Sequence, residues 1–268
     1  MIAETLQKEL RERYNPDGST LRRHQMRMLE MLQYVDSVCT KHNIRYWLCS
    51  GTLLGAVRHG GFIPWDDDLD IEMLKEDYKK FVKIVEKEKN DDYVLQTHKT
   101  DPNYYAPYAK LRDIHSYLKE NHPLDAHYKY HGIFIDIFVL VPSSSYLLTR
   151  IPEFFQRLIY HANRIKPDRK ILTKCLYCVT YKIVFPFFST MGRIGAGNQL
   201  RIVHGSFYCK PRYSTDIFPL DWLEFEGMPF PVPHNCDGYL RKIYGDYMKL
   251  PDLSKIRKHL TVIEFYDR

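Results

Sequence analysis

The sequence has no apolar run at its amino terminus: the first eighteen residues, MIAETLQKELRERYNPDG, are mostly polar. Such a segment is typical of a helical lead-in, and it lacks the basic start and apolar stretch of a signal peptide or a membrane anchor. Internal repeats and low-complexity tracts are absent as well. We therefore predict a cytoplasmic protein. If it binds lipid, we expect it to bind the inner face of the membrane.

Cysteine is scarce and scattered, with six residues in a chain of 268. This usage does not resemble a disulfide framework, so we expect reduced thiols. Only Cys175 and Cys178 form a CxxC pair, and no second pair accompanies it. A zinc or redox site is therefore not indicated.

Acidic residues are nearly missing from residues 151–213, which contain eleven basic and two acidic side chains among many aromatic ones. The pattern suits an anionic lipid surface or a polyanionic substrate, and it also fits a solvated helical layer with an aromatic inner face. Lys174, Lys182, Pro186 and Arg193 interrupt its apolar run, so we expect this segment to lie on a membrane rather than to cross it. We expect no nucleic-acid partner.

Helical and strand patterns alternate along the first 142 residues. Ser19 is placed to cap a helix, and Gly60 and Gly61 are placed to end another. The expected helices cover residues 19–43, 52–59 and 76–89, and the expected strands cover residues 44–50, 62–73, 93–98, 108–113 and 132–141. This order predicts an α/β (α+β) fold, in which helices flank a mixed sheet.

Four segments follow from these patterns. Residues 1–18 form the lead-in, residues 19–142 the core, and residues 143–213 a basic, aromatic, helical insertion. Residues 214–268 complete the domain with a hairpin that turns at Glu226 and Gly227, and with a short helix that Gly245 ends.

Four aspartates stand within five positions of the stretch GTLLGAVRHGGFIPWDDDLDIEM. If residues 62–73 form a strand, Asp66, Asp68 and Asp70 share one face, while Leu69 and Ile71 point into the core. Carboxylates two residues apart on a strand repel each other by about 2 to 3 kcal/mol at an effective dielectric near 20. A bound divalent cation removes this repulsion.

Oxygen ligands select magnesium, manganese or calcium rather than zinc. A calcium loop of the EF-hand type also begins with alternating aspartates, but it requires glycine at its sixth position and glutamate at its twelfth. Counted from Asp66, these positions hold Ile71 and Asp77, so the EF-hand pattern is excluded.

A further carboxylate, Asp136, lies inside the apolar stretch GIFIDIFVLV. An unpaired carboxylate buried in a strand costs several kcal/mol, about 3 to 5, so a cation must meet it. One interpretation is a salt bridge with Lys110 or Arg112. The other is that this strand lies beside the aspartate strand, so that Asp136 joins the same metal site.

Gly51 and Thr52 stand at a predicted turn from strand to helix. A glycine followed by a hydroxyl at such a turn lets backbone amides approach a phosphate closely. Together with the carboxylates, the turn indicates a nucleotidyltransferase-like site, where amides bind phosphates and aspartates hold a metal.

These stretches, together with YAKLRD, FEGMPFPVP and YGDYM, resemble the LicD family of phosphotransferases and the catalytic domains of fukutin and fukutin-related protein. The resemblance extends over roughly residues 21–251 and leaves the basic segment unmatched. It implies a nucleotidyltransferase fold and the transfer of an alcohol phosphate, most often phosphocholine from CDP-choline, to a hydroxyl of a cell-surface glycan such as lipopolysaccharide or teichoic acid.

The resemblance also implies roles for individual residues. Asp68 and Asp70 would be metal ligands for Mg²⁺ or Mn²⁺, and Asp136 would be a third ligand or the general base. Gly51 and Thr52 would hold the nucleotide phosphates of a cytidine diphosphate alcohol donor. Lys110 and Arg112 would neutralise phosphate charge, unless they serve only as partners of Asp136. Asp66 matches the first aspartate of the family pattern but is separated from the other two.

Two other interpretations remain open at this point. A metal-dependent glycosyltransferase also binds a sugar nucleotide through aspartates, although it does not explain the turn at Gly51 and Thr52. The second interpretation is a noncatalytic adaptor with a metal-stabilised fold, although a binding module does not need three convergent carboxylates. The donor alcohol, and whether the glycan acceptor is lipid-linked, are not fixed by the residues.

Overall fold

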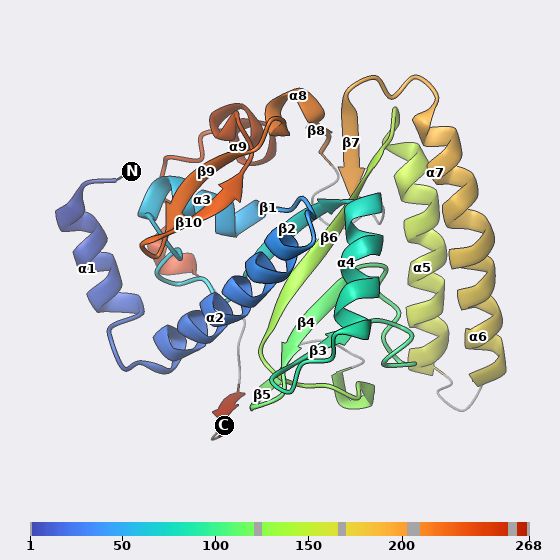
Figure 1. Cartoon of the computed structure of the whole chain (residues 1–268), viewed down its shortest axis with the longest axis horizontal. Coiled ribbons are helices and arrows are strands. Elements are labelled where there is room, and N and C mark those ends of the chain that lie inside the picture. The colour runs from blue at the N-terminus through green and yellow to red at the C-terminus, as the bar shows by residue number, and fades with distance from the viewer. Residues whose placement is uncertain (1, 121–124, 166–169, 203–209, 257–261, 267–268) are drawn as a thin grey trace.

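The computed structural model describes residues 2–120, 125–165, 170–202, 210–256 and 262–266. Its helices are α1 (Glu4–Tyr14), α2 (Thr20–Lys41), α3 (Ser50–His59), α4 (Lys75–Lys87), α5 (Leu147–Ile165), α6 (Lys170–Val179), α7 (Phe185–Arg193), α8 (Ser214–Ile217) and α9 (Cys236–Tyr244). Its strands are β1 (Trp47–Leu48), β2 (Asp70–Leu74), β3 (Tyr93–Gln96), β4 (Ala109–Asp113), β5 (Ser116–Lys119), β6 (Phe134–Pro142), β7 (Gln199–Ile202), β8 (Arg212–Tyr213), β9 (Asp221–Phe225), β10 (Met228–Val232) and β11 (Val262–Phe265). The fold is a mixed sheet flanked by helices, as predicted (Figure 1).

The central sheet has the order β1-β2-β6-β4-β3, and β7 and β8 extend it from β6. Strands β2 and β6 are parallel, whereas β1 with β2, β4 with β6 and β3 with β4 are antiparallel. Strand β4 pairs with the first half of β6, and β7 pairs with its last three residues. The long strand β6 therefore has a different partner at each end.

Local signals set the helices that precede the aspartates. The Ser19 side chain accepts a hydrogen bond from the Arg22 amide and so caps α2, as predicted. Gly60 adopts a left-handed conformation with φ of 67° and ends α3. Both predicted boundaries are therefore confirmed.

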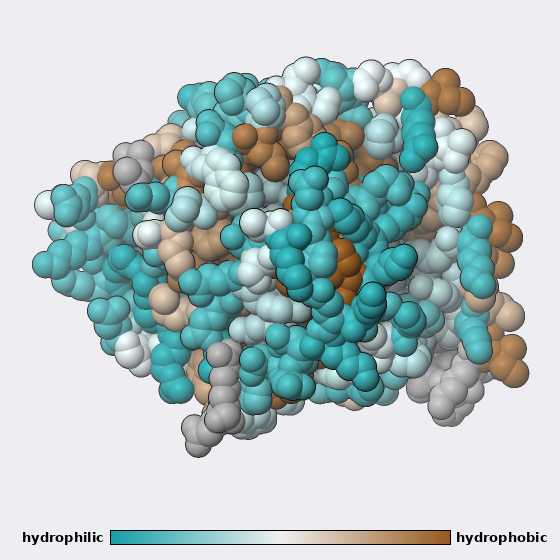
Figure 2. Space-filling view, viewed as in Figure 1, coloured by the Kyte–Doolittle hydropathy of each residue, from teal (hydrophilic) through white to brown (hydrophobic). Residues whose placement is uncertain are grey.

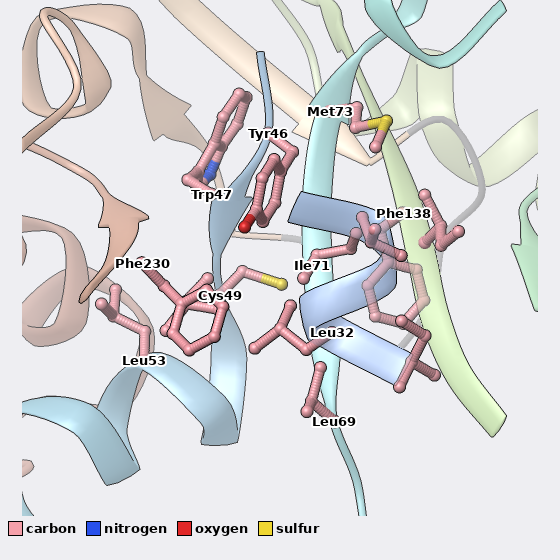
Figure 3. Close-up of a cluster of buried hydrophobic side chains, with 14 of the residues drawn as sticks. Leu32, Tyr46, Trp47, Cys49, Leu53, Leu69, Ile71, Met73, Phe138 and Phe230 are labelled. Atoms are coloured by element: carbon pink, nitrogen blue, oxygen red, sulfur yellow. The ribbon is translucent and has the colours of Figure 1, made fainter. Parts of the chain in front are cut away.

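The core lies between α2 and the sheet. Leu32 of α2 packs near Leu69 and Ile71, and the side chains of β1 and β10 complete the cluster (Figure 3). Leu69 and Ile71 are fully buried, as their alternation with Asp70 predicted. This burial fixes the side of the sheet on which Asp70 lies.

The predicted strand over residues 62–73 is wrong for most of its length, since only Asp70–Leu74 forms β2. The residues before it form a loop, so the positions of the Asp66 and Asp68 side chains do not follow from the alternation of a strand. Side chains of α2 bind the carbonyl groups of this loop in place of a neighbouring strand. Pro64 also removes one amide donor.

The segment 143–213 is helical only in part. Helices α5, α6 and α7 form a layer at one side of the sheet (Figure 1), but Gln199–Ile202 and Arg212–Tyr213 are strands of the central sheet. The expectation of a purely helical insertion is therefore corrected: the last part of the segment pairs with the open edge of β6. Burial of Leu200 and Ile202 favours this pairing.

The carboxyl-terminal hairpin and helix agree with the sequence. Strands β9 and β10 pair around Glu226 and Gly227, whose φ angles of 52° and 79° are those of a tight two-residue hairpin turn. Gly245 ends α9, as predicted. One pairing was not anticipated: β11 joins β5 in a separate two-stranded sheet.

Candidate active site

Parallel pairing of β2 and β6 places Asp70 beside Asp136. The two residues are direct Cα partners in the register, and the Asp136 amide donates to the Leu69 carbonyl at 3.0 Å. Side chains of partnered residues lie on the same face of a sheet. The prediction that the Asp136 strand lies beside the aspartate strand is thus confirmed.

The electrostatics of these carboxyl groups show a shortage of positive charge. Burial, with repulsion from Asp136 and Asp68, raises the pKa of Asp70 well above its usual range. Burial also raises the pKa of Asp136 to about 6, although Lys110 opposes the shift. Oδ1 of Asp136 is buried and accepts no hydrogen bond from the residues that the structure describes. These oxygens fit a divalent cation of the magnesium type, which takes carboxylate ligands.

The loop before β2 brings three more carboxylates together. Ligand oxygens of Asp66, Asp67 and Asp68 lie within 4.8 Å of one another. Burial, with repulsion from Asp68 and Asp67, raises the pKa of Asp66. On a strand, Asp66 would be separated from Asp68 and Asp70, so we did not predict it as a metal ligand. In the structure, the loop instead brings the carboxyl group of Asp66 close to that of Asp68.

Helix α2 holds this loop through two buried polar side chains. Gln25 donates to the Asp66 carbonyl at 2.8 Å, and His24 Nε2 lies 2.9 Å from the Asp67 carbonyl oxygen. Asn15 in turn donates to Gln25 at 2.7 Å. These side chains satisfy backbone groups that have no strand partner, so they fix the position of the acidic loop.

The first turn of α3 faces the carboxylates. The Thr52 hydroxyl accepts a hydrogen bond from the Asp70 amide at 2.8 Å. A Cβ atom added to Gly51 would lie 2.8 Å from Oδ2 of Asp66, so the glycine permits this close approach. The predicted neighbours Gly51 and Thr52 therefore lie against the start of β2, with the positive end of a helix beside them.

Replacing Thr52 by valine is expected to destabilise the protein. Thr52 is buried, and Thr52→Val leaves the Asp70 amide without its acceptor, which costs about 1 to 3 kcal/mol. Thr52→Ser keeps the hydroxyl and is the matched control. Urea denaturation of both variants measures the difference, and equal stability of the valine and serine variants would show that the hydrogen bond does not matter.

The two predicted basic residues of β4 have different surroundings. Lys110 is the register partner of Asp136, and its Nζ lies 3.8 Å from Oδ1 of Asp136 and 2.7 Å from Glu120. Arg112 is fully buried and donates to Gln96 at 2.6 Å and to the Gly132 carbonyl at 2.9 Å. Lys110 therefore adjoins the carboxylates, whereas Arg112 is engaged in structural hydrogen bonds.

Glu120 joins the two basic side chains and is a residue that sequence reasoning missed. It forms ion pairs with both Lys110 and Arg112. Burial alone would raise its pKa, but Lys110 and Arg112 together lower the pKa of Glu120 to about 2. Its position directly after β5 carries no motif, so the sequence offered no signal for it.

A cavity of about 450 Å³ adjoins the acidic loop. Its lining is mostly apolar and includes Tyr14, Leu21, Trp65, Asp67, Leu253 and Ile263. The Trp65 ring meets Tyr14 edge to face, with 5.4 Å between the ring centroids. The cavity thus has two aromatic residues and one residue of the aspartate cluster in its lining.

Carboxylates from a loop and two parallel strands thus lie next to the amino terminus of a helix, an arrangement suited to holding a metal ion beside a phosphate. Residues 43–174 match the family described as LicD/FKTN/FKRP, nucleotidyltransferase domain. These residues therefore form a domain of the LicD family, as the motifs predicted.

Two similar proteins have named activities. The lipopolysaccharide cholinephosphotransferase LicD of Haemophilus influenzae is 28% identical over 261 residues, which cover 90% of this chain and 96% of that protein. The human ribitol 5-phosphate transferase FKRP is 50% identical over 48 residues, which cover 18% of this chain and 10% of that protein. An uncharacterized protein of Rickettsia typhi is 43% identical over 93 residues, or 35% of this chain and 29% of that protein.

Proposed function

We propose that the protein is a metal-dependent phosphotransferase that moves an alcohol phosphate from a cytidine diphosphate alcohol to a hydroxyl of a cell-surface glycan, such as lipopolysaccharide or teichoic acid. The observation that carries this proposal is the pairing of Asp70 with Asp136 beside the amino terminus of α3. The named relatives transfer phosphate groups, which favours this function over a sugar-nucleotide glycosyltransferase.

Asp68, Asp70 and Asp136 are the proposed ligands for Mg²⁺ or Mn²⁺. Their carboxylate oxygens match the preference of these ions, and the raised pKa of Asp70 and Asp136 reflects the charge that a cation would neutralise. When bound, such an ion offsets negative charge on the phosphoryl and leaving oxygens.

The amides of Gly51 and Thr52 are the proposed contacts to the donor pyrophosphate, because the start of a helix attracts anions. Lys110 adds a positive charge next to Asp136. Arg112 would contribute to phosphate neutralisation only through its charge at a distance, since its donors already bind oxygens of Gln96, Gly132 and Glu120.

In the proposed reaction, the acceptor hydroxyl oxygen attacks the phosphorus nearest the alcohol, in line with the bond to CMP. A new P–O bond to the glycan forms, the P–O bond to CMP breaks, and CMP leaves. The hydroxyl proton passes to a carboxylate, and Asp136 is our candidate for this role as the alternative to its role as a third metal ligand, because its Oδ1 lacks a hydrogen-bond partner among the described residues.

Choline is the donor alcohol that we favour. The relative that spans nearly the whole chain is a cholinephosphotransferase. Quaternary ammonium groups bind to aromatic faces, and the cavity beside the acidic loop is lined by Trp65 together with Asp67. Arg13 already lies 5.2 Å from the Tyr14 ring centroid, so choline would use the tryptophan side of this cavity.

Release of CMP from a panel of donors tests the proposal. We expect CDP-choline, with magnesium and a glycan acceptor, to yield CMP faster than CDP-ribitol or CDP-glycerol, and we expect a chelator to stop the reaction. Turnover of a sugar nucleotide, without turnover of any cytidine diphosphate alcohol, would contradict it.

A cytoplasmic location at the inner face of the membrane is part of the same proposal, since CDP-alcohols are soluble nucleotides.

A further inference from the structure

Helices α6 and α7, joined by the π-helical turn Thr180–Val184, expose a stripe of large apolar side chains. Val179, Ile183, Phe187 and Met191 recur every four residues, and each is between 43% and 62% exposed. Residues at this spacing lie on one side of a helix. The stripe is distant in sequence from the aspartates, and Figure 2 shows apolar residues along the edge of the molecule where α6 and α7 lie.

A second apolar stripe lies on the neighbouring helix α5. Leu147, Ile151 and Phe154 are exposed at helical spacing. Exposed apolar residues scattered singly are normal on a soluble protein, whereas stripes of this length mark an interaction surface. The helical layer therefore has an outer side that is built to meet an apolar environment.

Charge identifies the kind of partner. Residues 171–194 contain Lys174, Lys182 and Arg193 and no acidic residue. All three basic side chains are exposed. Pairing this surface with a second copy of itself would bring like charges together without compensation, whereas an anionic bilayer offers both apolar chains and negative head groups.

The opposite side of the same helix is attached to the domain along its length. Residues 171–193 are long enough and apolar enough to cross a membrane by length and composition alone. However, Tyr177 stacks on His98 with 3.7 Å between ring centroids. Near the other end, the Ser144 amide donates to the Gly192 carbonyl at 2.8 Å. A helix fixed at both ends to a polar domain cannot span a bilayer without leaving that domain.

We propose that the stripe of Val179, Ile183, Phe187 and Met191 lies in the interface of an anionic membrane, with the helix parallel to the membrane plane. The apolar side chains enter the boundary between head groups and acyl chains, and the basic side chains extend to the phosphates. The inference goes beyond the proposed function and does not depend on which group the enzyme transfers.

Vesicle flotation of the full chain tests this surface. We expect binding to vesicles of phosphatidylcholine with one quarter phosphatidylglycerol, weaker binding to pure phosphatidylcholine, and loss of binding as salt rises. The variant Ile183→Ser with Phe187→Ser should bind at least tenfold more weakly. The matched control is Ile114→Ser with Trp222→Ser, which removes two exposed apolar residues outside the helical layer and should bind like the wild type.

A charge variant, Lys182→Gln with Arg193→Gln, removes exposed charges without touching the core and should weaken binding to anionic vesicles only. Equal binding by the serine double variant and the wild type would overturn the proposal, as would failure of the wild type to bind either vesicle. A wild-type dimer that becomes monomeric in the serine variant would also overturn it, since a second copy would then cover the stripe. CMP release with a soluble acceptor is measured in parallel and distinguishes failure here from failure of the proposed function.

Discussion

Asp70→Asn is expected to lower the rate of CMP release by at least about a hundredfold, since changes even behind a metal ligand cost about ten- to a hundredfold. Asp70 starts β2, is paired with Asp136, and has a pKa raised by burial and by its acidic neighbours. Asparagine keeps the shape of the side chain but removes the charge that would bind a cation. Asp68→Asn is expected to act in the same direction.

Stability distinguishes this loss from misfolding. Without metal, Asp70→Asn should melt at the same temperature as the wild type or higher, because it removes repulsion among buried carboxylates. The control is Asp91→Asn, the same chemical change at an exposed aspartate in the loop before β3, which should leave both the rate and the melting temperature unchanged. Full turnover by Asp70→Asn and Asp68→Asn would show that neither residue is a metal ligand required for the reaction.

The second large effect is a loss of stability, and it concerns the buried ion pair between Glu72 and Arg212. Glu72, two residues after Asp70, is fully buried and accepts hydrogen bonds from Trp47 at 3.0 Å, Tyr239 at 2.8 Å and Arg212 at 3.1 Å. These contacts connect β1, β2, β8 and α9. Arg212→Met would leave the Glu72 carboxylate buried without a cation, which is expected to cost about 3 to 5 kcal/mol of unfolding free energy.

Urea denaturation measures this cost. The matched control is Arg241→Met, because Arg241 pairs with Asp237 at the surface, where both side chains are more than half exposed. That variant should stay close to the wild type. The double variant Arg212→Met with Glu72→Leu should recover part of the lost stability, since it removes both charges. Equal stability of the Arg212 and Arg241 variants would show that the buried pair contributes little.

The helices and turns near the site could be predicted because their signals are local. The cap at Ser19, the glycine at position 60 and the turn at Glu226 and Gly227 each act within a few residues. The pairing of Asp70 with Asp136 could also be predicted, since a lone carboxylate in an apolar strand requires a polar neighbour. Local pattern and buried charge were sufficient there.

The remaining features depend on contacts between distant residues. Residues 62–69 have strand-like composition, but Gln25 and His24 of α2 bind their carbonyl groups and keep them in a loop. The pairing of β7 with β6, and of Arg212 with Glu72, joins segments that are far apart in the sequence. No periodicity records such partners, so the sequence could not reveal them.

The most direct test of the account is a crystal structure of the protein with Mn²⁺ and CDP-choline, in which anomalous scattering locates the ion. We predict manganese bound by oxygens of Asp68, Asp70 and Asp136, with the donor pyrophosphate against the amides of Gly51 and Thr52. An ion held only by Asp66 and Asp67, or a pyrophosphate bound away from the start of α3, would contradict it.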